Sequence, residues 1–153
     1  METEISLLDM FTRLGVAAGL ALVLGLEREL RGKAAGLRSH MLVALGAAAF
    51  LIVGLEILHA TAEGDPSARI DPTRIVEGVI GGIGFLGAGS IIRSGASVHG
   101  ITTGASIWLA GAIGVAAGVD NFPLAGMVTL MALVIISVLG AIERFLPGHG
   151  SGD

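Results

Sequence analysis

Five long apolar runs, separated by short clusters of charge, constrain this chain more than any other feature of its sequence. Each run holds roughly 18 to 22 residues, about the length of helix that crosses a bilayer. A soluble chain of this size would carry charge over most of its surface, yet 14% of its residues are charged and 53% are hydrophobic. The pattern predicts an all-α, polytopic transmembrane bundle with five membrane-spanning helices. Residues 1–146 would form one transmembrane domain and residues 147–153 a disordered tail.

The runs and the residues between them predict where the helices begin and end. We expect helices at about residues 5–26, 39–58, 73–93, 101–119 and 122–142. Asp71 and Pro72 favour a helix start, because Asp can cap free backbone amides and Pro is tolerated at the first helical position. In the first run, Asp9 and Arg13 are four residues apart, which predicts that they pair on one helical face.

The distribution of Lys and Arg predicts an orientation in the membrane. With the N-terminus outside, six of the nine Lys and Arg residues lie on the cytoplasmic side. They are Arg28, Arg31, Lys33, Arg38, Arg93 and Arg144. Short loops rich in Lys and Arg stay in the cytoplasm, so we expect the N-terminus out and the C-terminus in. The acidic start Glu2 to Glu4 lacks the basic region of a secretory signal, which favours a retained first span.

Acidic residues gather at the predicted outer side. Glu56 and Glu77 come nearest to the apolar layer, and Asp71 lies close by in sequence. Carboxylates at the edge of the membrane layer are candidates for a functional site. Their oxygens suit hard cations such as Mg²⁺. The alternative is that Glu77 pairs with Arg74 at headgroup depth. Spacing alone leaves any metal site undefined.

Polar residues also flank the inner starts of the second and fourth runs. Arg38 and His40 begin one run, and Thr102 and Thr103 begin the other. Helix N-termini with Arg and hydroxyl groups attract anions, which makes these residues candidates for a ligand site. The alternative is simple capping and anchoring to lipid phosphates. Trp108 lies in mid-run and is expected in the core.

The densest glycine segment, residues 78–89, contains a G-x-G-x-x-G match inside an apolar run. A dinucleotide fingerprint needs a preceding strand, so close helix packing in lipid is the better interpretation. A broken helix lining a solute path is a second interpretation. The glycines expected to pack are Gly78, Gly82, Gly84, Gly87 and Gly89. Cysteine is absent, and no nucleophile, base and orienting acid stand together, so we expect no enzyme activity.

Several segments together resemble the MgtC/SapB family of bacterial inner-membrane proteins. They are Gly25-Leu26-Glu27-Arg28-Glu29, the segment from Gly36-Leu37-Arg38-Ser39-His40 to Gly46, Asp71-Pro72-Thr73-Arg74-Ile75, the segment from Gly82 to Gly89, and Gly100-Ile101-Thr102-Thr103 leading to Trp108. The resemblance implies a multi-pass bundle of the bacterial inner membrane, without enzyme activity or a cofactor. It singles out six polar residues for a ligand site: Glu27, Arg28, Arg38, His40, Asp71 and Arg74. Longer members carry a cytoplasmic C-terminal domain, which we expect this short member to lack.

We therefore expect a protein that supports Mg²⁺ or membrane-energy homeostasis by binding a partner or a small ligand. The expected partners are the lipid bilayer, further copies of the chain and, as the resemblance implies, the proton-translocating ATP synthase. Nucleic acid is not expected. The alternative function is a small transporter or channel for an ion or small solute. Glu77, Thr102 and Thr103 complete the set of candidate ligand-binding residues.

Overall fold

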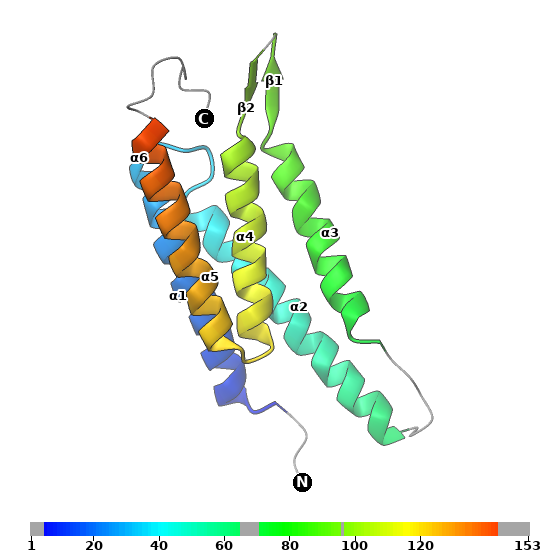
Figure 1. The fold of residues 1–153 in the computed structure, drawn as a ribbon. Coiled ribbons are helices and arrows are strands. Elements are labelled where there is room, and N and C mark those ends of the chain that lie inside the picture. The colour runs from blue at the N-terminus through cyan, green and yellow to red at the C-terminus, as the bar shows by residue number, and fades with distance from the viewer. Residues whose placement is uncertain (1–4, 65–70, 96, 144–153) are drawn as a thin grey trace.

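The computed structural model describes residues 5–64, 71–95 and 97–143. The predicted tail and Arg144 lie outside the described residues. Figure 1 shows a helical bundle with one small β-hairpin. In chain order the elements are α1 (Leu7–Leu30), α2 (Leu37–Gly64), α3 (Thr73–Gly89), β1 (Ile92–Ser94), β2 (Ser97–His99), α4 (Ile101–Gly118), α5 (Phe122–Val134), the π-helical turn η1 (Ile135–Leu139) and α6 (Gly140–Glu143).

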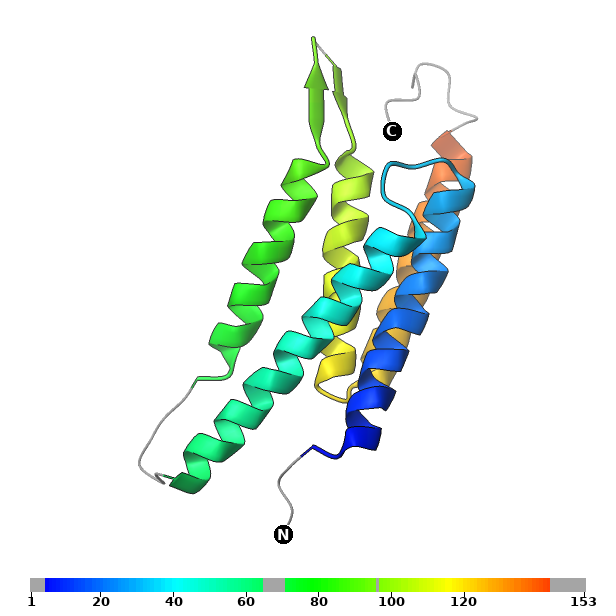
Figure 2. The ribbon, with the colours of Figure 1, turned by 180° about the vertical axis from the view of Figure 1, so that it is seen from behind.

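Helix α4 is the central element of the bundle, since it packs against α1, α2, α3 and α5. Helices α1 and α5 lie together on one side of it, α2 crosses the bundle obliquely, and α3 stands at the opposite edge (Figures 1 and 2). The α1–α2 connection, the β1–β2 hairpin and α6 share one end of the molecule, called here the hairpin end. The start of α1 and the α4–α5 connection lie at the opposite end.

The bundle has the dimensions of a multi-pass membrane protein. Four helical segments are long and apolar enough to cross a bilayer: Leu7–Leu30, Leu37–Thr61, Ile101–Gly118 and Phe122–Ile142. Helix α3 has 17 residues, the lower limit of the lengths that span a hydrocarbon core. The predicted all-α membrane bundle is confirmed by these four helices, and the fifth span remains a prediction for α3.

Helix boundaries differ from the prediction where polar side chains find partners inside the protein. Helix α1 continues to Leu30 because Glu27 and Arg28 are packed within the bundle rather than placed in a loop. Helix α2 continues to Gly64, beyond the predicted end at residue 58. The third helix ends at Gly89, and the chain then forms the hairpin rather than helix up to residue 93.

Small residues let α4 approach its neighbours closely. A Cβ added at Gly104 would lie 2.8 Å from the Gly87 carbonyl oxygen, and one added at Gly118 would lie 2.8 Å from Leu51 Cβ. Such contacts bring helix backbones together in lipid, where packing and hydrogen bonds replace the hydrophobic effect as the driving force. Trp108, predicted in the core, is 45% exposed and lines a small apolar cavity together with residues of α3 and α5.

The predicted pairing of Asp9 with Arg13 is wrong. Asp9 instead accepts a 2.7 Å hydrogen bond from the Ser6 hydroxyl at the start of α1. The Arg13 guanidinium donates a 2.8 Å hydrogen bond to the Gly118 carbonyl oxygen and lies 4.0 Å from Asp120. The Gly118 carbonyl oxygen lies at the C-terminus of α4, and the partial negative charge of this helix end attracts the Arg13 guanidinium.

Candidate functional site

A polar cluster lies at the hairpin end, where α1, α2 and α4 meet. We call it the buried cluster; it consists of Glu27, Arg28, Arg31, His40, Thr103 and Ser106. Arg28 is 2% exposed, and His40, Thr103 and Ser106 are all buried. Charged side chains are almost never fully buried unless they are paired. The cluster is therefore the first place to look for a function within the membrane bundle.

Glu27 is the acid of the buried cluster and lies between two arginines. Its Oε2 is 3.9 Å from Nη1 of Arg28, and its Oε1 forms a close ion pair with Nε of Arg31 one helical turn later. The Glu27 side chain is only 12% exposed, so these interactions are poorly screened by water. The three side chains together carry one net positive charge.

His40 joins α2 to α4 through its two ring nitrogens. Nδ1 lies 2.8 Å from the Gly36 carbonyl oxygen, which can only accept, so Nδ1 carries hydrogen. Nε2 lies 3.0 Å from Ser106 Oγ, which is itself 2.8 Å from the Thr103 carbonyl oxygen. The imidazole thus links the first turn of α2 to the first two turns of α4, and it does not face an open ligand cavity.

Two glycines allow α1 and α2 to meet at the buried cluster. A Cβ added at Gly25 would lie 2.9 Å from Leu37 Cα and 3.2 Å from His40 Cβ. A Cβ added at Gly36 would collide with the carboxylate of Glu29, whose Oε2 accepts a 3.1 Å hydrogen bond from the Leu37 amide. The carboxylate therefore satisfies one of the free amides at the start of α2.

Ser106→Ala is expected to lower the free energy of unfolding by about 1–3 kcal/mol, because it leaves the buried Nε2 of His40 without its hydroxyl partner. Unfolding of the purified protein in mixed detergent measures the loss. The matched control is Thr12→Ala, which removes an exposed hydroxyl bonded to Leu8 of its own helix. The control should change stability by less than about 0.5 kcal/mol. Equal losses would contradict the structural role of the His40 link.

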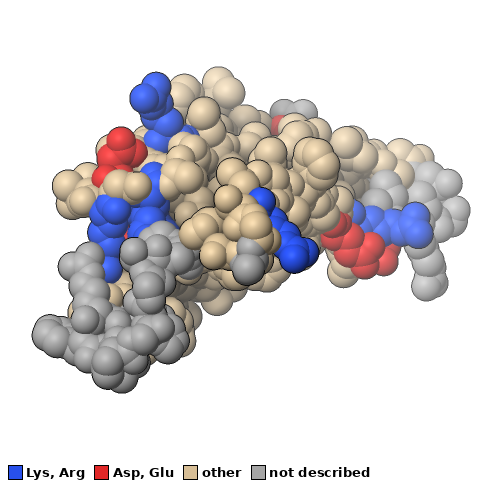
Figure 3. Space-filling view, turned by 90° about the horizontal axis from the view of Figure 1, so that it is seen from above, with Lys and Arg blue, Asp and Glu red and all other residues tan. Residues whose placement is uncertain are grey.

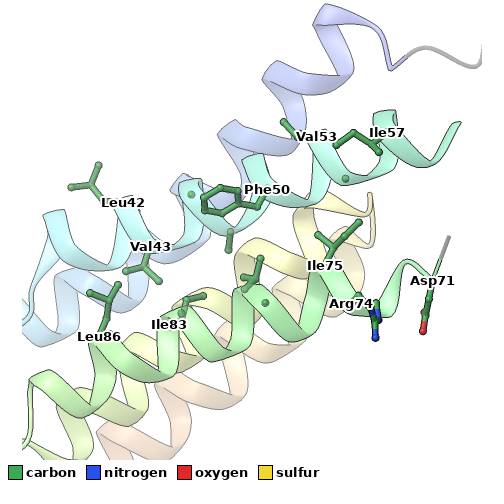
Figure 4. Close-up of a pocket in the computed structure, with 16 residues that line it drawn as sticks. Leu42, Val43, Phe50, Val53, Ile57, Asp71, Arg74, Ile75, Ile83 and Leu86 are labelled. Atoms are coloured by element: carbon green, nitrogen blue, oxygen red, sulfur yellow. The ribbon is translucent and has the colours of Figure 1, made fainter. Parts of the chain in front are cut away.

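An apolar groove runs between α2 and α3 and has a volume of about 1110 Å³. Figure 4 shows side chains from both helices turned into the space between them. Leu42 and Leu86 mark its end nearer the hairpin, and Ile57, Asp71 and Arg74 mark the other end. The groove opens sideways because α3 packs mainly on α4 and touches α2 much less. It therefore suits a long apolar occupant.

Asp71 starts α3 as predicted. Its Oδ1 accepts hydrogen bonds from the Thr73 amide at 2.9 Å and from the Thr73 hydroxyl at 2.6 Å. The hydroxyl bond, followed by the amide bond, holds the pKa of the Asp71 carboxyl below its ordinary value, because both bonds favour the charged form. The stability from this cap is complete above the ordinary Asp pKa and is lost as the pH falls through the lowered pKa.

Thr73→Val is expected to raise the pKa of Asp71 toward its ordinary value, since the hydroxyl bond is the largest cause of the shift. A carboxyl-resolved NMR titration of the protein in detergent micelles measures this directly. Thr61→Val is the matched control, because Thr61 bonds to the Ile57 carbonyl of its own helix. An unchanged Asp71 titration in Thr73→Val would show that the hydroxyl bond does not hold the carboxylate.

The structure brings together only some of the predicted site residues. Glu27, Arg28, His40 and Thr103 meet in the buried cluster, whereas Arg38 is exposed on α2 and Thr102 is half-buried. Asp71 and Arg74 line the end of the groove, and Glu77 is exposed on α3. No group of three His, Asp or Glu side chains among the described residues is placed to hold a metal ion.

Sequence reasoning missed Arg31 and Ser106 as members of the buried cluster. Arg31 follows Glu27 by four residues, the spacing of an ion pair on a helix. A predicted first helix that continued past residue 26 would have placed both residues on one helical face. Ser106 follows Thr103 by three residues and so shares its face of α4. Of the five glycines predicted to pack, Gly87 lies against α4, and an added Cβ at the other four would meet no atom within 4 Å.

Comparison with known proteins gives a consistent result. A profile of the MgtC family matches residues 14–145. A protein of Escherichia coli K12 named "Putative magnesium transporter YhiD" is 37% identical over 134 residues, which are 85% of this chain and 60% of the relative. Protein MgtC of Brucella abortus (strain 2308) is 36% identical over 124 residues, which are 81% of this chain and 48% of the relative.

An uncharacterised protein of Synechocystis sp. (strain ATCC 27184 / PCC 6803 / Kazusa) is 38% identical over 146 residues, 95% of this chain and 57% of that protein. The chain thus spans about half to three-fifths of the length of these relatives. No solved structure gives a significant match to it.

Proposed function

Because the chain belongs to the MgtC family, we propose that it is a non-enzymatic protein of the bacterial inner membrane that supports magnesium or membrane-energy homeostasis by binding a partner or a small ligand. Relatives named for magnesium transport or as MgtC motivate the link to magnesium. The four long apolar helices and the family together make the chain a multi-pass membrane protein.

The observation that carries the proposal is the contrast between the buried cluster and the groove. The charges of the cluster face one another inside the bundle, and the large cavity is apolar with one acid and one base at one end. A route for a hydrated cation would need polar groups along its length to replace water. The arrangement therefore supports a binding scaffold better than a conduit.

We expect the hairpin end to face the cytoplasm, with five spans, the N-terminus out and the C-terminus in. Among the described residues, Arg28, Arg31, Lys33, Arg38 and Arg93 belong to this end, and Arg13 and Arg74 belong to the opposite end. Figure 3 views the molecule from the hairpin end and shows several Lys and Arg side chains there. This bias follows the positive-inside rule. Reporter fusions within residues 31–36 should behave as cytoplasmic.

Two kinds of protein partner are proposed. A second copy of the chain fits the exposed glycines of α1, because Gly15 and Gly19 offer space for a close helix crossing. The proton-translocating ATP synthase is the partner that the family resemblance suggests. Crosslinking in native membranes, followed by purification, should recover one of these two. If repeated experiments recover neither a second copy of the chain nor the ATP synthase, the proposal of a protein partner is wrong.

Growth in limiting Mg²⁺ tests the proposed function in cells. A strain that lacks the gene should grow more slowly than its parent only when Mg²⁺ is scarce, and the intact chain should restore growth. Glu27→Gln, at a membrane level equal to that of the intact chain, should fail to restore growth because it breaks the ion pairs of the buried cluster. The exposed Glu77→Gln should restore it. Equal growth of the deleted and parent strains at every Mg²⁺ concentration would reject the proposal.

The second candidate function is a transporter for a cation or small solute. The printed name of the Escherichia coli relative favours this candidate. Two features of the groove argue against it, namely its sideways opening and its apolar lining. The two functions make opposite predictions for Mg²⁺ flux across a lipid bilayer.

A further inference from the structure

We propose that the groove between α2 and α3 binds an anionic glycerophospholipid of the cytoplasmic leaflet, with its phosphate at Arg38 and its acyl chains between the helices. The inference rests on the proposed orientation of the hairpin end, and it names a ligand that the proposed function leaves open.

The groove is long and has an apolar lining. On α2 its lining runs from Leu42 to Ile57, a rise of about 22 Å along the helix. This length covers most of the roughly 30 Å hydrocarbon core of a bilayer. Apolar side chains dominate both walls, and Gly46 and Gly82 leave open space where side chains would otherwise stand. The groove can therefore accept acyl chains along its length.

Arg38 lies at the end of the groove nearer the hairpin. It precedes Leu42 by four residues, so it lies one helical turn further toward the hairpin end on the same side of α2. The side chain is exposed, and no hydrogen bond or ion pair to its guanidinium occurs within the described part of the chain. The positively charged Arg38 side chain therefore lies beyond the inner end of the apolar groove, where we place the lipid phosphate.

The two ends of the groove differ in charge. At the outer end Asp71 stands beside Arg74, so their charges offset one another. At the inner end the Glu29 carboxylate, which belongs to α1, accepts a hydrogen bond from the Leu37 amide. The start of α2 adds partial positive charge. The inner end therefore favours an anionic headgroup, and the outer end does not.

Native mass spectrometry of the delipidated protein in mild detergent tests the proposal. Phosphatidylglycerol is the anionic probe, and phosphatidylcholine is the zwitterionic probe. The protein should bind phosphatidylglycerol more tightly, and Arg38→Gln should weaken that binding about fivefold, the factor expected for one arginine at an anionic lipid surface. Arg93→Gln, at an exposed arginine in the hairpin, is the matched control and should leave the preference unchanged.

A second pair of variants tests the groove itself. Gly46→Leu with Gly82→Leu should fill the open space and weaken binding of both lipids. Gly126→Leu, which also meets open space but lies on α5 away from the groove, should leave both unchanged. Gel filtration confirms that each variant stays monodisperse, and the Arg38 comparison stands if the filled groove fails to fold.

Three results would overturn the proposal. Equal weakening by Arg38→Gln and Arg93→Gln would assign the lipid preference to general surface charge. Unchanged lipid binding in the filled groove would place the lipid elsewhere. Dissociation of a dimer on filling the groove, with lipid binding unchanged, would show that a second copy occupies it. None of these lipid-binding results changes the expected growth defect in low Mg²⁺. The lipid proposal can therefore be wrong while the proposed function stands.

Discussion

Gly114→Ala should lower the free energy of unfolding by about 3 kcal/mol or more, the upper part of the range for overpacked cores. A Cβ at this position would overlap the Ala44 carbonyl oxygen and would lie 2.8 Å from Ala47 Cβ. The first obstacle is backbone, which cannot rotate away as a side chain could. Helices α2 and α4 would have to separate along their whole contact, and this contact contains the buried residues Ala44 and Ile113.

Gly126→Ala is the matched control for this prediction. Gly126 also lies in a helix, α5, but an added Cβ would meet no atom within 4 Å. The substitution should therefore be neutral or stabilise the protein by up to about 1 kcal/mol, because Ala favours helix over Gly. Reversible unfolding in mixed detergent measures both variants. Similar stabilities for the two would contradict the close approach of α2 and α4.

Glu27→Gln should destabilise the protein by about 3–5 kcal/mol, the loss expected when one partner of a buried ion pair is removed. The substitution preserves size but removes the only acid of the buried cluster. Arg28, at 2% exposure, and Arg31 would both lose the carboxylate that lies between them. The hairpin end of α1 is expected to open first, which hydrogen exchange of the amides around Arg28 would detect.

Glu77→Gln removes the same charge as Glu27→Gln but at an exposed position, so the comparison shows how much of the loss in stability depends on burial. Glu77 is exposed on α3, so its substitution should change stability by less than about 0.5 kcal/mol. A double variant, Glu27→Gln with Arg31→Gln, should lose less than the sum of the two single losses because their ion pair is shared. Strict additivity would show that the two residues do not interact in the membrane bundle.

The lengths of the apolar runs were sufficient to predict four of the membrane helices. A helix in lipid must satisfy its backbone internally, so an apolar run of bilayer length has few alternatives. Local chemistry was equally informative at Asp71, where the side chain and the following Pro72 predicted the start of α3. These predictions depend only on residues that are neighbours in sequence.

Predictions failed where a distant element competed for a side chain. Arg13 bonds to Gly118, which is 105 residues away, instead of pairing with Asp9. The hairpin replaced a predicted helical turn at 92–93, because the chain needs Gly95 and Gly100 with positive φ at its two bends. The turn signal of Gly95 was present in the sequence, but the continuous apolar pattern outweighed it.

The site was predictable only in part for the same reason. The polar residues near both ends of α1 and α2 were recognised, but their division between a buried cluster and a groove depends on helix directions. The groove exists because α3 packs mainly against α4 and contacts α2 much less. No spacing in the sequence predicts this packing. Arg38 and His40, two residues apart, consequently face different surroundings.

Magnesium flux in proteoliposomes tests the central claim most directly. Purified protein, reconstituted with an Mg²⁺-sensitive dye inside the vesicles, is exposed to inward Mg²⁺ gradients with and without a membrane potential. A binding scaffold predicts flux equal to that of protein-free vesicles under every gradient, from protein that also restores growth in low Mg²⁺. Saturable Mg²⁺ entry that depends on the protein would contradict the account and establish a transporter.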